Sequence, residues 1–401
     1  MVPMEIKRNV FNKLNDEITE PFISILLGAR QVGKSTLLKK LEQTAQKKGL
    51  KTAYFNLELS SDLAQLSGNH KEIFNLLTQK AQVIFIDEFH YLENASKIFK
   101  AIYDSQCGVK IFASGSSSTE IHKHLKESLA GRFRKTIIHP LSWDEYQQIP
   151  KVNLSDYLQW GGMPGLIHLS TSEEKMDLLE NIVSTYLAKD IKALIKEENV
   201  RAFNSLLYVL AHNQGGITPI SNMAREIGLA EPTLARYLDI MAHTYICFQV
   251  TSFSGNLANE LKKSRKYYLF DLGIRNSLLK DFRIPDHRDD NGILHESFVF
   301  WHLQNQMKPN MEIRFWRTKK GDEVDFIVIK NRTPHPIEVK STLHKMEIPS
   351  GLSYFMKTYP KAPFGIVFNK NLKGEKKLGH RPVYFMKLEE AASLPLMQTV
   401  L

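Results

Sequence analysis

Residues 28–35 read Gly-Ala-Arg-Gln-Val-Gly-Lys-Ser and follow the apolar run Phe22–Leu27. This is a complete G-x-x-x-x-G-K-S pattern, and a helix-like segment, Ser35–Lys47, comes directly after it. Such a loop curls its backbone N–H groups round phosphates, and the helix that follows points its positive end at them. The pattern predicts ATP binding through Gly28, Arg30, Gln31, Val32, Gly33, Lys34, Ser35 and Thr36. We expect Lys34 to reach the β- and γ-phosphates and Ser35 to ligate Mg²⁺.

A second segment, Val83-Ile84-Phe85-Ile86-Asp87-Glu88, is an apolar strand that ends in two carboxylates. Asp87 can hold the Mg²⁺ shell, and Glu88 can polarise the attacking water as the catalytic base. The alternative is a solvated acidic strand end. The run Thr52–Leu57 lies between the two motifs, which leaves room for a sheet in which another strand separates the phosphate-binding strand from the acidic one.

The first 145 residues alternate apolar runs with amphipathic segments, which predicts an α/β fold with a parallel sheet. The further expected runs are Val109–Ala113 and Thr136–Leu141, and the further helices include Lys97–Asp104 and Thr119–Leu129. Downstream, the pattern changes three times. We therefore expect four parts: an ATPase core (residues 1–145), a helical lid (146–199), a winged-helix domain (200–280) and a C-terminal α/β domain (285–401).

Composition restricts the class of protein. The 401 residues include 53 Lys and Arg against 43 Asp and Glu, a net charge of +10 that suits a phosphate-rich partner such as nucleic acid. No apolar run approaches the ~20 residues of a membrane span, and Met1–Arg8 has no secretory h-region. Cys107 and Cys247 form no C-x-x-C pair. We expect a cytoplasmic protein with no membrane partner.

The middle of the chain has helix-turn-helix spacing. A helix over Pro219–Gly228 is followed by a second helix, Glu231–His243, and then by two strands, Ile246–Val250 and Lys266–Asp271, that could form a wing. Arg236 on the second helix is expected to be exposed and to contact DNA. Lys262, Lys263 and Arg265 belong to a basic run that extends to Lys266 between the two strands, and they are expected to contact DNA phosphates. The alternative is an ATPase lid or a protein-docking module.

The C-terminal part carries a D…E-x-K constellation. Asp325 lies near the start of one strand, and Glu338 and Lys340 lie on the next. Two carboxylates on a hairpin can hold Mg²⁺ or Mn²⁺, and Lys340 can neutralise charge on a phosphodiester. Glu296 lies on the apolar stripe of the helix Ile293–Met307, where a carboxylate is costly without a partner. This set predicts a restriction-endonuclease-like nuclease fold, either catalytic or an inert binding module.

The chain resembles the AAA+ ATPases, and within them the bacterial and archaeal ATP-binding proteins with a C-terminal domain of unknown function. The resemblance rests on the following motifs: GARQVGKST (28–36), VIFIDEFH (83–90), IFASGSSS (111–118), LAGRFRKTIIHPLSWDEY (129–146), GGMPG (161–165), and the C-terminal ESFVFWHL, GDEVDF and PIEVK.

The resemblance implies further roles. Ser114 or Ser116 would sense the γ-phosphate, where many AAA+ relatives have Asn. Arg132 would be a catalytic arginine finger acting on a neighbouring copy, with Arg134 as a substitute; Arg132 could instead be a surface charge. Pro164 would touch the adenine, or simply form a helix corner. Together these features predict a homo-oligomeric, DNA-acting ATPase with a nuclease-like domain, or else an ATP-driven switch or DNA-gripping motor in which that domain is inert.

Overall fold

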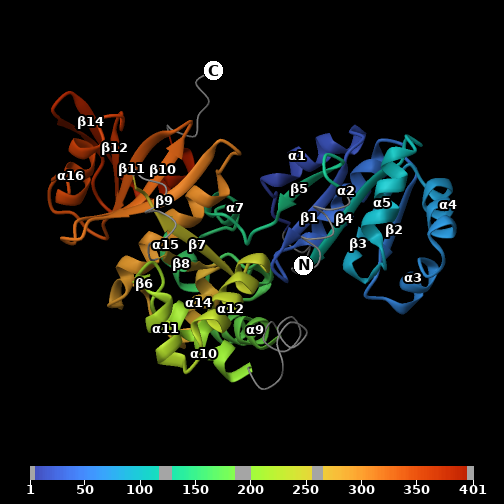
Figure 1. Cartoon of the computed structure of the whole chain (residues 1–401), viewed down its shortest axis with the longest axis horizontal. Helices are drawn as coiled ribbons and strands as arrows, with labels where there is room; N and C mark the ends of the chain where they lie inside the picture. The colour runs from blue at the N-terminus through green and yellow to red at the C-terminus, as the bar shows by residue number, and fades with distance from the viewer. Residues whose placement is uncertain (1–4, 117–128, 186–199, 255–264, 395–401) are drawn as a thin grey trace. The chain divides into compact units, whose positions relative to one another are not determined.

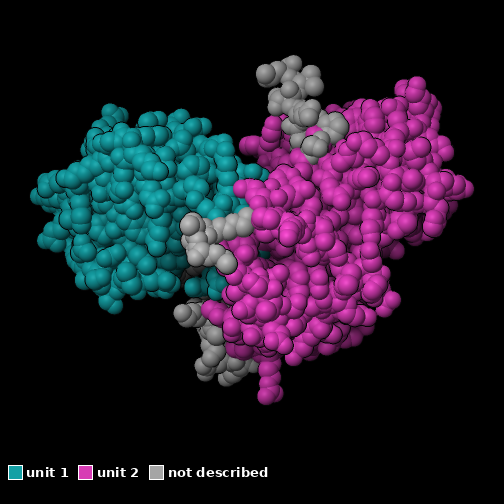
Figure 2. Space-filling model, turned by 180° about the vertical axis from the view of Figure 1, so that it is seen from behind, with its two compact units in different colours: residues 1–141, 163–165, 239–246 teal, residues 142–162, 166–238, 247–401 magenta. Residues whose placement is uncertain are grey.

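The computed structural model describes residues 5–116, 129–185, 200–254 and 265–394. The chain divides into two compact units, shown in different colours in Figure 2. Unit 1 comprises residues 1–141, 163–165 and 239–246, and unit 2 comprises residues 142–162, 166–238 and 247–401. The described residues include only Leu129 of the expected helix Thr119–Leu129. They do not include Lys262 and Lys263.

Unit 1 is built on a five-stranded sheet in the order β2-β3-β4-β1-β5, and every pairing in it is parallel. Its strands are β1 (Ile23–Gly28), β2 (Thr52–Asn56), β3 (Val83–Asp87), β4 (Lys110–Ser116) and β5 (Phe133–Ile137). The expected α/β class is confirmed, and β4 does separate the phosphate-binding strand from the acidic one. The last strand begins three residues before the predicted Thr136, because Phe133 already pairs with Ile23.

Helices flank this sheet (Figure 1, blue to cyan). They are α1 (Val10–Asp16), α2 (Lys34–Lys47), α3 (Ser60–Gln65), α4 (His70–Lys80) and α5 (Ala95–Asp104). Helix α2 buries Leu37, Leu38 and Leu41, which recur at helical spacing, and packs on β1, β3 and β4. This packing fixes the start of α2 at the carboxyl edge of the sheet, where parallel α/β folds bind ligands.

The first part of unit 2 is helical. It contains α7 (Trp143–Tyr146), α8 (Leu154–Trp160), α9 (Ser172–Thr185), α10 (Val200–His212), α11 (Ile220–Ile227), the first part of α12 (Glu231–His243) and α14 (Leu272–Leu279); the last residues of α12, from Asp239, are counted with unit 1. Pro219 caps the start of α11, and Gly228 ends it with a left-handed φ of 70°. The predicted helix pair and the two strands after it are therefore present.

A nine-stranded mixed sheet forms the rest of unit 2, in the order β13-β14-β12-β11-β10-β9-β7-β8-β6. Its strands are β6 (Ile217–Thr218), β7 (Cys247–Ser252), β8 (Arg265–Leu269), β9 (Met311–Arg317), β10 (Glu323–Lys330), β11 (Thr333–Val339), β12 (Gly365–Asn369), β13 (Gly374–Leu378) and β14 (Arg381–Lys387). Strands β7 and β9 pair in parallel at Thr251 and Arg314. The strands expected for a wing thus share one sheet with the C-terminal strands.

Two helices pack on this sheet, α15 (Asn291–Asn305) and α16 (Ser350–Thr358). The core under α16 joins Leu352 and Phe355 to Trp316 and Val324. On β10 the pairing with β9 shifts register between Val324 and Ile327. Such an irregularity bends a strand and redirects its side chains, and Asp325 is one of the two residues inside it.

Candidate functional site

The phosphate-binding loop leaves β1 at Gly28, where space is very tight. A Cβ on Gly28 would collide with the carbonyl oxygen of Ile138. Gln31 and Gly33 have φ of 60° and 94°, in the left-handed region, and Gly33 is the residue before α2. These angles turn the backbone into a cradle that ends at the helix N-terminus. The local geometry is that of an anion-binding loop.

Lys34 is buried at this loop, with 5% of its surface exposed. Its Nζ donates to the carbonyl oxygens of Ala29 at 2.8 Å and Gly28 at 3.2 Å. A buried ammonium needs such partners, and phosphate oxygens would serve it better because they carry charge. Ser35 and Thr36 are exposed at the start of α2, so their hydroxyls are accessible to a metal–nucleotide complex.

Asp87 ends β3 at the same edge of the sheet and is 4% exposed. Tyr54 donates to its Oδ2 at 3.1 Å, and the Ser114 hydroxyl donates to its Oδ1. Burial and the neighbouring carboxylate of Asp87 raise the pKa of Tyr54, so the phenol keeps its proton for this bond. The carboxylate is thereby held in one orientation, as a ligand for a hydrated Mg²⁺ must be.

Glu88 follows Asp87 with a φ of 54°, an uncommon angle for a residue with a side chain. The backbone turns at Glu88, so this residue does not continue the alternation of side chains along β3, which ends at Asp87. Its Oε2 lies 3.2 Å from Nδ1 of His90, and only 13% of the side chain is exposed. Glu88 thus follows the carboxyl end of β3, and its role as a catalytic base stays a prediction.

Sequence reasoning missed Arg8, which braces the phosphate loop. Its guanidinium donates to the carbonyl oxygens of Val32 at 2.9 Å and His139 at 2.6 Å. Burial, and secondarily the Arg8 charge, lower the pKa of His139 to about 4, so that imidazole is neutral near pH 7. The contacts span 24 and 131 residues of sequence, so no local pattern signals them.

The segment Gly161–Gly165 has a structural explanation for its glycines. The N–H of Gly162 donates to Oδ2 of Asp271 at 2.7 Å, and a Cβ on Gly161 would collide with the same carboxylate. Pro164 begins the 3₁₀ helix Pro164–His168, and a Cβ on Gly33 would lie 3.9 Å from its Cγ. Pro164 therefore lies beside the phosphate loop, and its contact with adenine stays a prediction.

Arg132 lies at the opposite edge of the sheet from the phosphate loop. It precedes β5, whose Phe133 pairs with the first residue of β1, whereas the loop follows the last residue of β1. Six residues of β1 separate these edges, and at about 3.3 Å per residue this is about 20 Å. Arg132 makes two hydrogen bonds to the Asp104 carboxylate, at 2.6 Å and 3.2 Å. It cannot reach the phosphates of its own chain without a large rearrangement.

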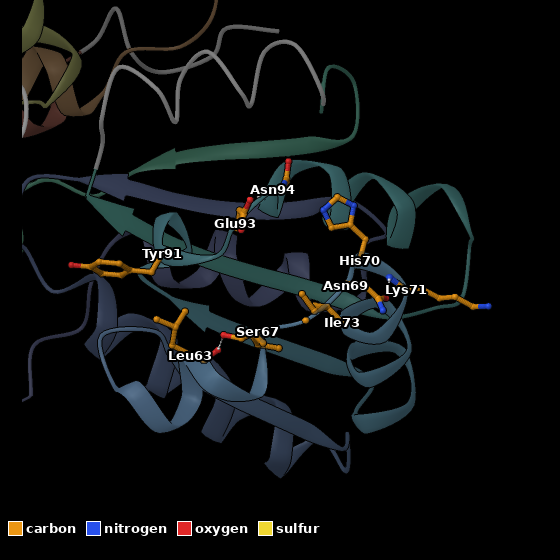
Figure 3. A pocket seen from close by; sticks show the side chains of 11 residues that line it. Leu63, Ser67, Asn69, His70, Lys71, Ile73, Tyr91, Glu93 and Asn94 are labelled. Atoms are coloured by element: carbon orange, nitrogen blue, oxygen red, sulfur yellow. Dashed lines mark hydrogen bonds between the residues drawn. The ribbon is translucent and has the colours of Figure 1, made fainter.

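A hollow of about 750 Å³ lies elsewhere in unit 1, between α3, the start of α4 and the segment after β3 (Figure 3). Leu63 and Ser67 line one side, and Tyr91, Glu93 and Asn94 line the other. The P-loop residues are not among its lining, so the hollow is separate from the phosphate cradle.

In unit 2, the predicted nuclease-like residues do come together. Asp325 on β10 accepts a hydrogen bond from the N–H of Val339 on β11 at 2.8 Å, and Lys340 Nζ lies 2.7 Å from Oε1 of Glu338. Burial, and after it the nearby Asp325 charge, raise the pKa of Glu338 to about 8, although Lys340 acts in the opposite direction. Burial also raises the pKa of Glu296 to about 7.

Lys266 is the residue that sequence reasoning placed wrongly. The basic run from Lys262 to Lys266 was expected to face nucleic-acid phosphates. Lys266 is instead 2% exposed, with Nζ 3.1 Å from Glu296 Oε1 and 2.8 Å from Glu323 Oε1. Side chains alternate along a strand, so Arg265 and Lys266 must point to opposite faces, and Lys266 shares the face of Tyr268, which also bonds Glu296. That period of two was the signal that could have found it.

The other described residues that were predicted to contact DNA differ in their exposure to solvent. Arg236 is exposed on α12. Arg265 is partly buried and donates to Oε1 of Gln249 at 2.5 Å. In the described part of the chain, no three His, Cys, Asp or Glu side chains form a ready-made metal cluster. Among the same residues, no helix is long and apolar enough to cross a membrane.

Comparison with known families divides the chain into three consecutive matches. The model of the AAA domain matches residues 20–147, and two domains of unknown function, DUF8612 and DUF4143, match residues 151–283 and 291–388. The AAA match covers the part of the chain that contains the complete phosphate-binding loop and the acidic strand end. The C-terminal parts match families whose function is not assigned.

Similar whole proteins are uncharacterized. One from Mycobacterium tuberculosis is 25% identical over 341 residues, covering 84% of this chain and 74% of the relative. One from Methanocaldococcus jannaschii is 24% identical over 327 residues, covering 76% and 72%. Among solved structures, AMPPCP-bound DnaA from Aquifex aeolicus is 15% identical, with 57% of this chain and 85% of that chain covered and a TM-score of 0.32. Bacteroides Pif1 bound to ssDNA is 14% identical, with 44% and 49% covered and a TM-score of 0.24. No residue role is carried over from them.

Proposed function

We propose that the chain hydrolyses ATP·Mg²⁺ at its P-loop and uses the nucleotide cycle to act on DNA, duplex or branched. The observation that supports the ATPase step is that the loop before Lys34 follows β1, and Asp87 and Glu88 follow β3, at the same carboxyl edge of the parallel sheet. Bound Mg²⁺ would neutralise charge on the phosphates. Lys34 would hold the β- and γ-phosphates, Ser35 and Asp87 would hold the metal and its waters, and Glu88 would accept the water's proton.

The ATPase test uses two variants with matched controls. Lys34→Ala should weaken ATP binding about a hundredfold, because it removes a charged donor from the phosphates. Lys39→Ala, on the exposed side of the same helix, should leave binding unchanged. Glu88→Gln should bind ATP normally but lose turnover, whereas the exposed Glu93→Gln should keep it. Normal turnover in Glu88→Gln would remove the catalytic role given to Glu88.

The DNA part of the proposal rests on unit 2. Helices α11 and α12 with strands β7 and β8 support a winged-helix arrangement, and Arg236 is exposed on the second helix. Affinity for DNA should fall with salt by a slope of about −0.9 per phosphate neutralised. Reversing the charge of Lys262 and Lys263 together should flatten that slope. An unchanged slope, or no DNA stimulation of the ATPase, would favour the protein-partner switch.

A second candidate activity is metal-dependent cleavage of DNA in unit 2. The observation that favours it is Oε2 of Glu338, which is buried and has no hydrogen-bond partner among the residues that the structure describes. A buried carboxylate oxygen left in this way is costly, and a divalent cation shared with Asp325 would satisfy it. Glu338, Asp325 and Glu296 would then bind metal and its waters, and Lys340 would face the scissile phosphate.

Cleavage is tested by incubating the full chain with duplex, forked and four-way DNA in Mg²⁺ or Mn²⁺, with and without ATP. Asp325→Ala and Glu338→Ala should abolish cutting and leave the ATPase rate unchanged. Glu347→Ala, which removes an exposed carboxylate paired with Lys345, should cut normally. Absence of cutting from every DNA form would leave unit 2 as a binding module.

A further inference from the structure

Lys266 is a buried cation inside the carboxylate cluster of unit 2. Its side chain is 2% exposed, and its Nζ lies 2.8 Å from Glu323 Oε1, 3.1 Å from Glu296 Oε1 and 3.9 Å from Asp325 Oδ1. Burying an ammonium so completely is expensive unless several acceptors surround it. The lysine therefore has a specific electrostatic role at this place in the fold.

The surroundings hold Lys266 and Glu296 against each other. Tyr268, two residues along β8, donates to the same Oε1 of Glu296 at 2.5 Å. A Cβ on Gly215 would lie 2.9 Å from that oxygen, so the backbone forms a wall there. The Phe315 ring lies on another side, with its centroid 5.5 Å from Nζ. Packing on these sides leaves the ammonium directed at carboxylates.

Glu338 completes the cluster without being satisfied by it. The residue is only 5% exposed, and its Oε1 lies 2.7 Å from Nζ of Lys340. Its Oε2 is buried and has no hydrogen-bond partner among the described residues. Asp325 connects the two halves, since its Oδ1 faces Lys266 and its Oδ2 accepts from Val339 next to Glu338. The cluster thus contains one buried cation, Lys266, a second and more exposed cation, Lys340, and one carboxylate oxygen that has no hydrogen-bond partner among the described residues.

We propose that Lys266 is a tethered counter-ion that competes with a divalent cation for these carboxylates and thereby sets the metal affinity of the cluster. This inference rests on the metal site proposed above. A metal bound by oxygen at about 2.0–2.2 Å must take lone pairs from the carboxylates that the ammonium contacts, and two cations so close repel each other. Metal binding therefore requires that the ammonium of Lys266 move away from at least the Asp325 carboxylate.

The test is calorimetric titration of the full chain with Mn²⁺ alone, without nucleotide or DNA. Lys266→Met keeps the length of the side chain and removes its charge, and it should bind Mn²⁺ about tenfold more tightly or better. Arg265→Met is the matched control, because it removes the same charge from the neighbouring residue on the opposite face of β8. It should match the wild type. Heat that persists in Asp325→Ala marks binding elsewhere and is subtracted.

Folding of each variant is checked by circular dichroism. Lys266→Gln keeps an N–H donor for Glu296 and Glu323, and it replaces Lys266→Met if that variant does not fold. Because the uncharged variants lose the resident cation, Mn²⁺ should also raise their melting temperature more than that of the wild type.

The outcomes separate this inference from the proposed cleavage. Equal Mn²⁺ affinity in the wild type and the Lys266 variants would overturn the inference and leave the metal site in place. Binding only in the variants would support the inference and show that the wild-type cluster excludes metal, against cleavage by the resting protein. Binding in neither would overturn both.

Discussion

The Ser114 hydroxyl donates a hydrogen bond to Oδ1 of Asp87, so the residue at the expected sensor position contacts the acidic residue that would hold Mg²⁺. Tyr54 occupies the other carboxylate oxygen. In this arrangement Ser114 orients the Asp87 carboxylate, and we expect any effect of Ser114 on the nucleotide to pass through that carboxylate. The serine that replaces the usual asparagine is thus used to orient a carboxylate.

We predict that Ser114→Ala raises the Mg²⁺ concentration needed for half-maximal ATPase activity about tenfold or more, while ATP affinity measured in EDTA stays constant. The loss of one hydrogen bond to a charged acceptor corresponds to about 1.5–3 kcal/mol. Tyr54→Phe should act in the same direction. Ser105→Ala removes a hydroxyl that bonds only within α5, to Ile102, and is the control. A change in metal-free ATP affinity would instead indicate direct contact with the γ-phosphate.

We predict that Arg132 acts across a subunit boundary. It lies at the amino edge of the sheet, opposite its own P-loop, so a role at the phosphates needs a neighbouring copy. Arg132→Ala and Lys34→Ala should each be inactive, and mixing them should restore part of the activity because mixed interfaces contain one intact site. The pairing with Asp104 supplies a contrast, since Asp104→Asn should release Arg132 without removing it. Mixtures that assemble but never recover turnover would leave Arg132 as a surface ion pair.

We predict that Arg8→Met weakens ATP binding about threefold to tenfold, through loss of the brace on the Val32 and His139 carbonyls. The phosphate loop would keep its residues but lose rigidity, so both the ATP and the ADP dissociation constants should rise together. Lys7→Ala is the matched control, since Lys7 is an exposed neighbour. If Arg8→Met binds nucleotide as the wild type does, the brace has only a structural function.

The sequence predicted the elements with strong local signals. Five apolar runs predicted the strands of unit 1, and the inner strands β1 and β3 are buried along their whole length, as is typical of parallel strands that are covered on both faces. The P-loop glycines could be assigned because Gly28 has no room for a Cβ and Gly33 has a left-handed φ of 94° that favours glycine. Charge was harder to interpret. The alternation of side chains along β8 could indicate that Lys266 points inward, but it could not identify the acidic partners Glu296 and Glu323, which lie 30 and 57 residues away in the sequence.

In the carboxylate cluster of unit 2, too, the sequence predicted that a partner is needed but not which residue it is. The apolar stripe of α15 correctly predicted that Glu296 would need a partner, and the hairpin correctly brought Asp325 near Glu338. The partner found is a lysine from β8. Pairing of β7 with β9 carries β8 into the sheet of the C-terminal strands, and a tertiary contact of this kind has no local sequence signature.

The last prediction concerns pH. The pKa of Glu338 is raised from 4.5 to about 8 by burial and by the Asp325 charge, and only partly offset by Lys340. Between these values the folded chain retains a proton that the unfolded chain releases. The stabilisation from this group is therefore complete below about pH 4.5 and is lost as the pH rises through about 8.

We therefore expect the free energy of unfolding of the metal-free protein to fall between pH 5 and pH 8.5, by at most about 1.4 kcal/mol per pH unit for this one group. Glu338→Gln carries a neutral amide at every pH, so its unfolding free energy should fall less steeply than that of the wild type. Glu347→Gln, at an exposed ion pair with Lys345, should keep the wild-type slope and controls for other titrating groups. Urea unfolding in EDTA at several pH values measures all three slopes. Parallel slopes for the wild type and Glu338→Gln would mean that the Glu338 carboxylate is ionised throughout this range, with Lys340 as a sufficient partner. In that case the buried Oε2 would not be the feature that favours a metal.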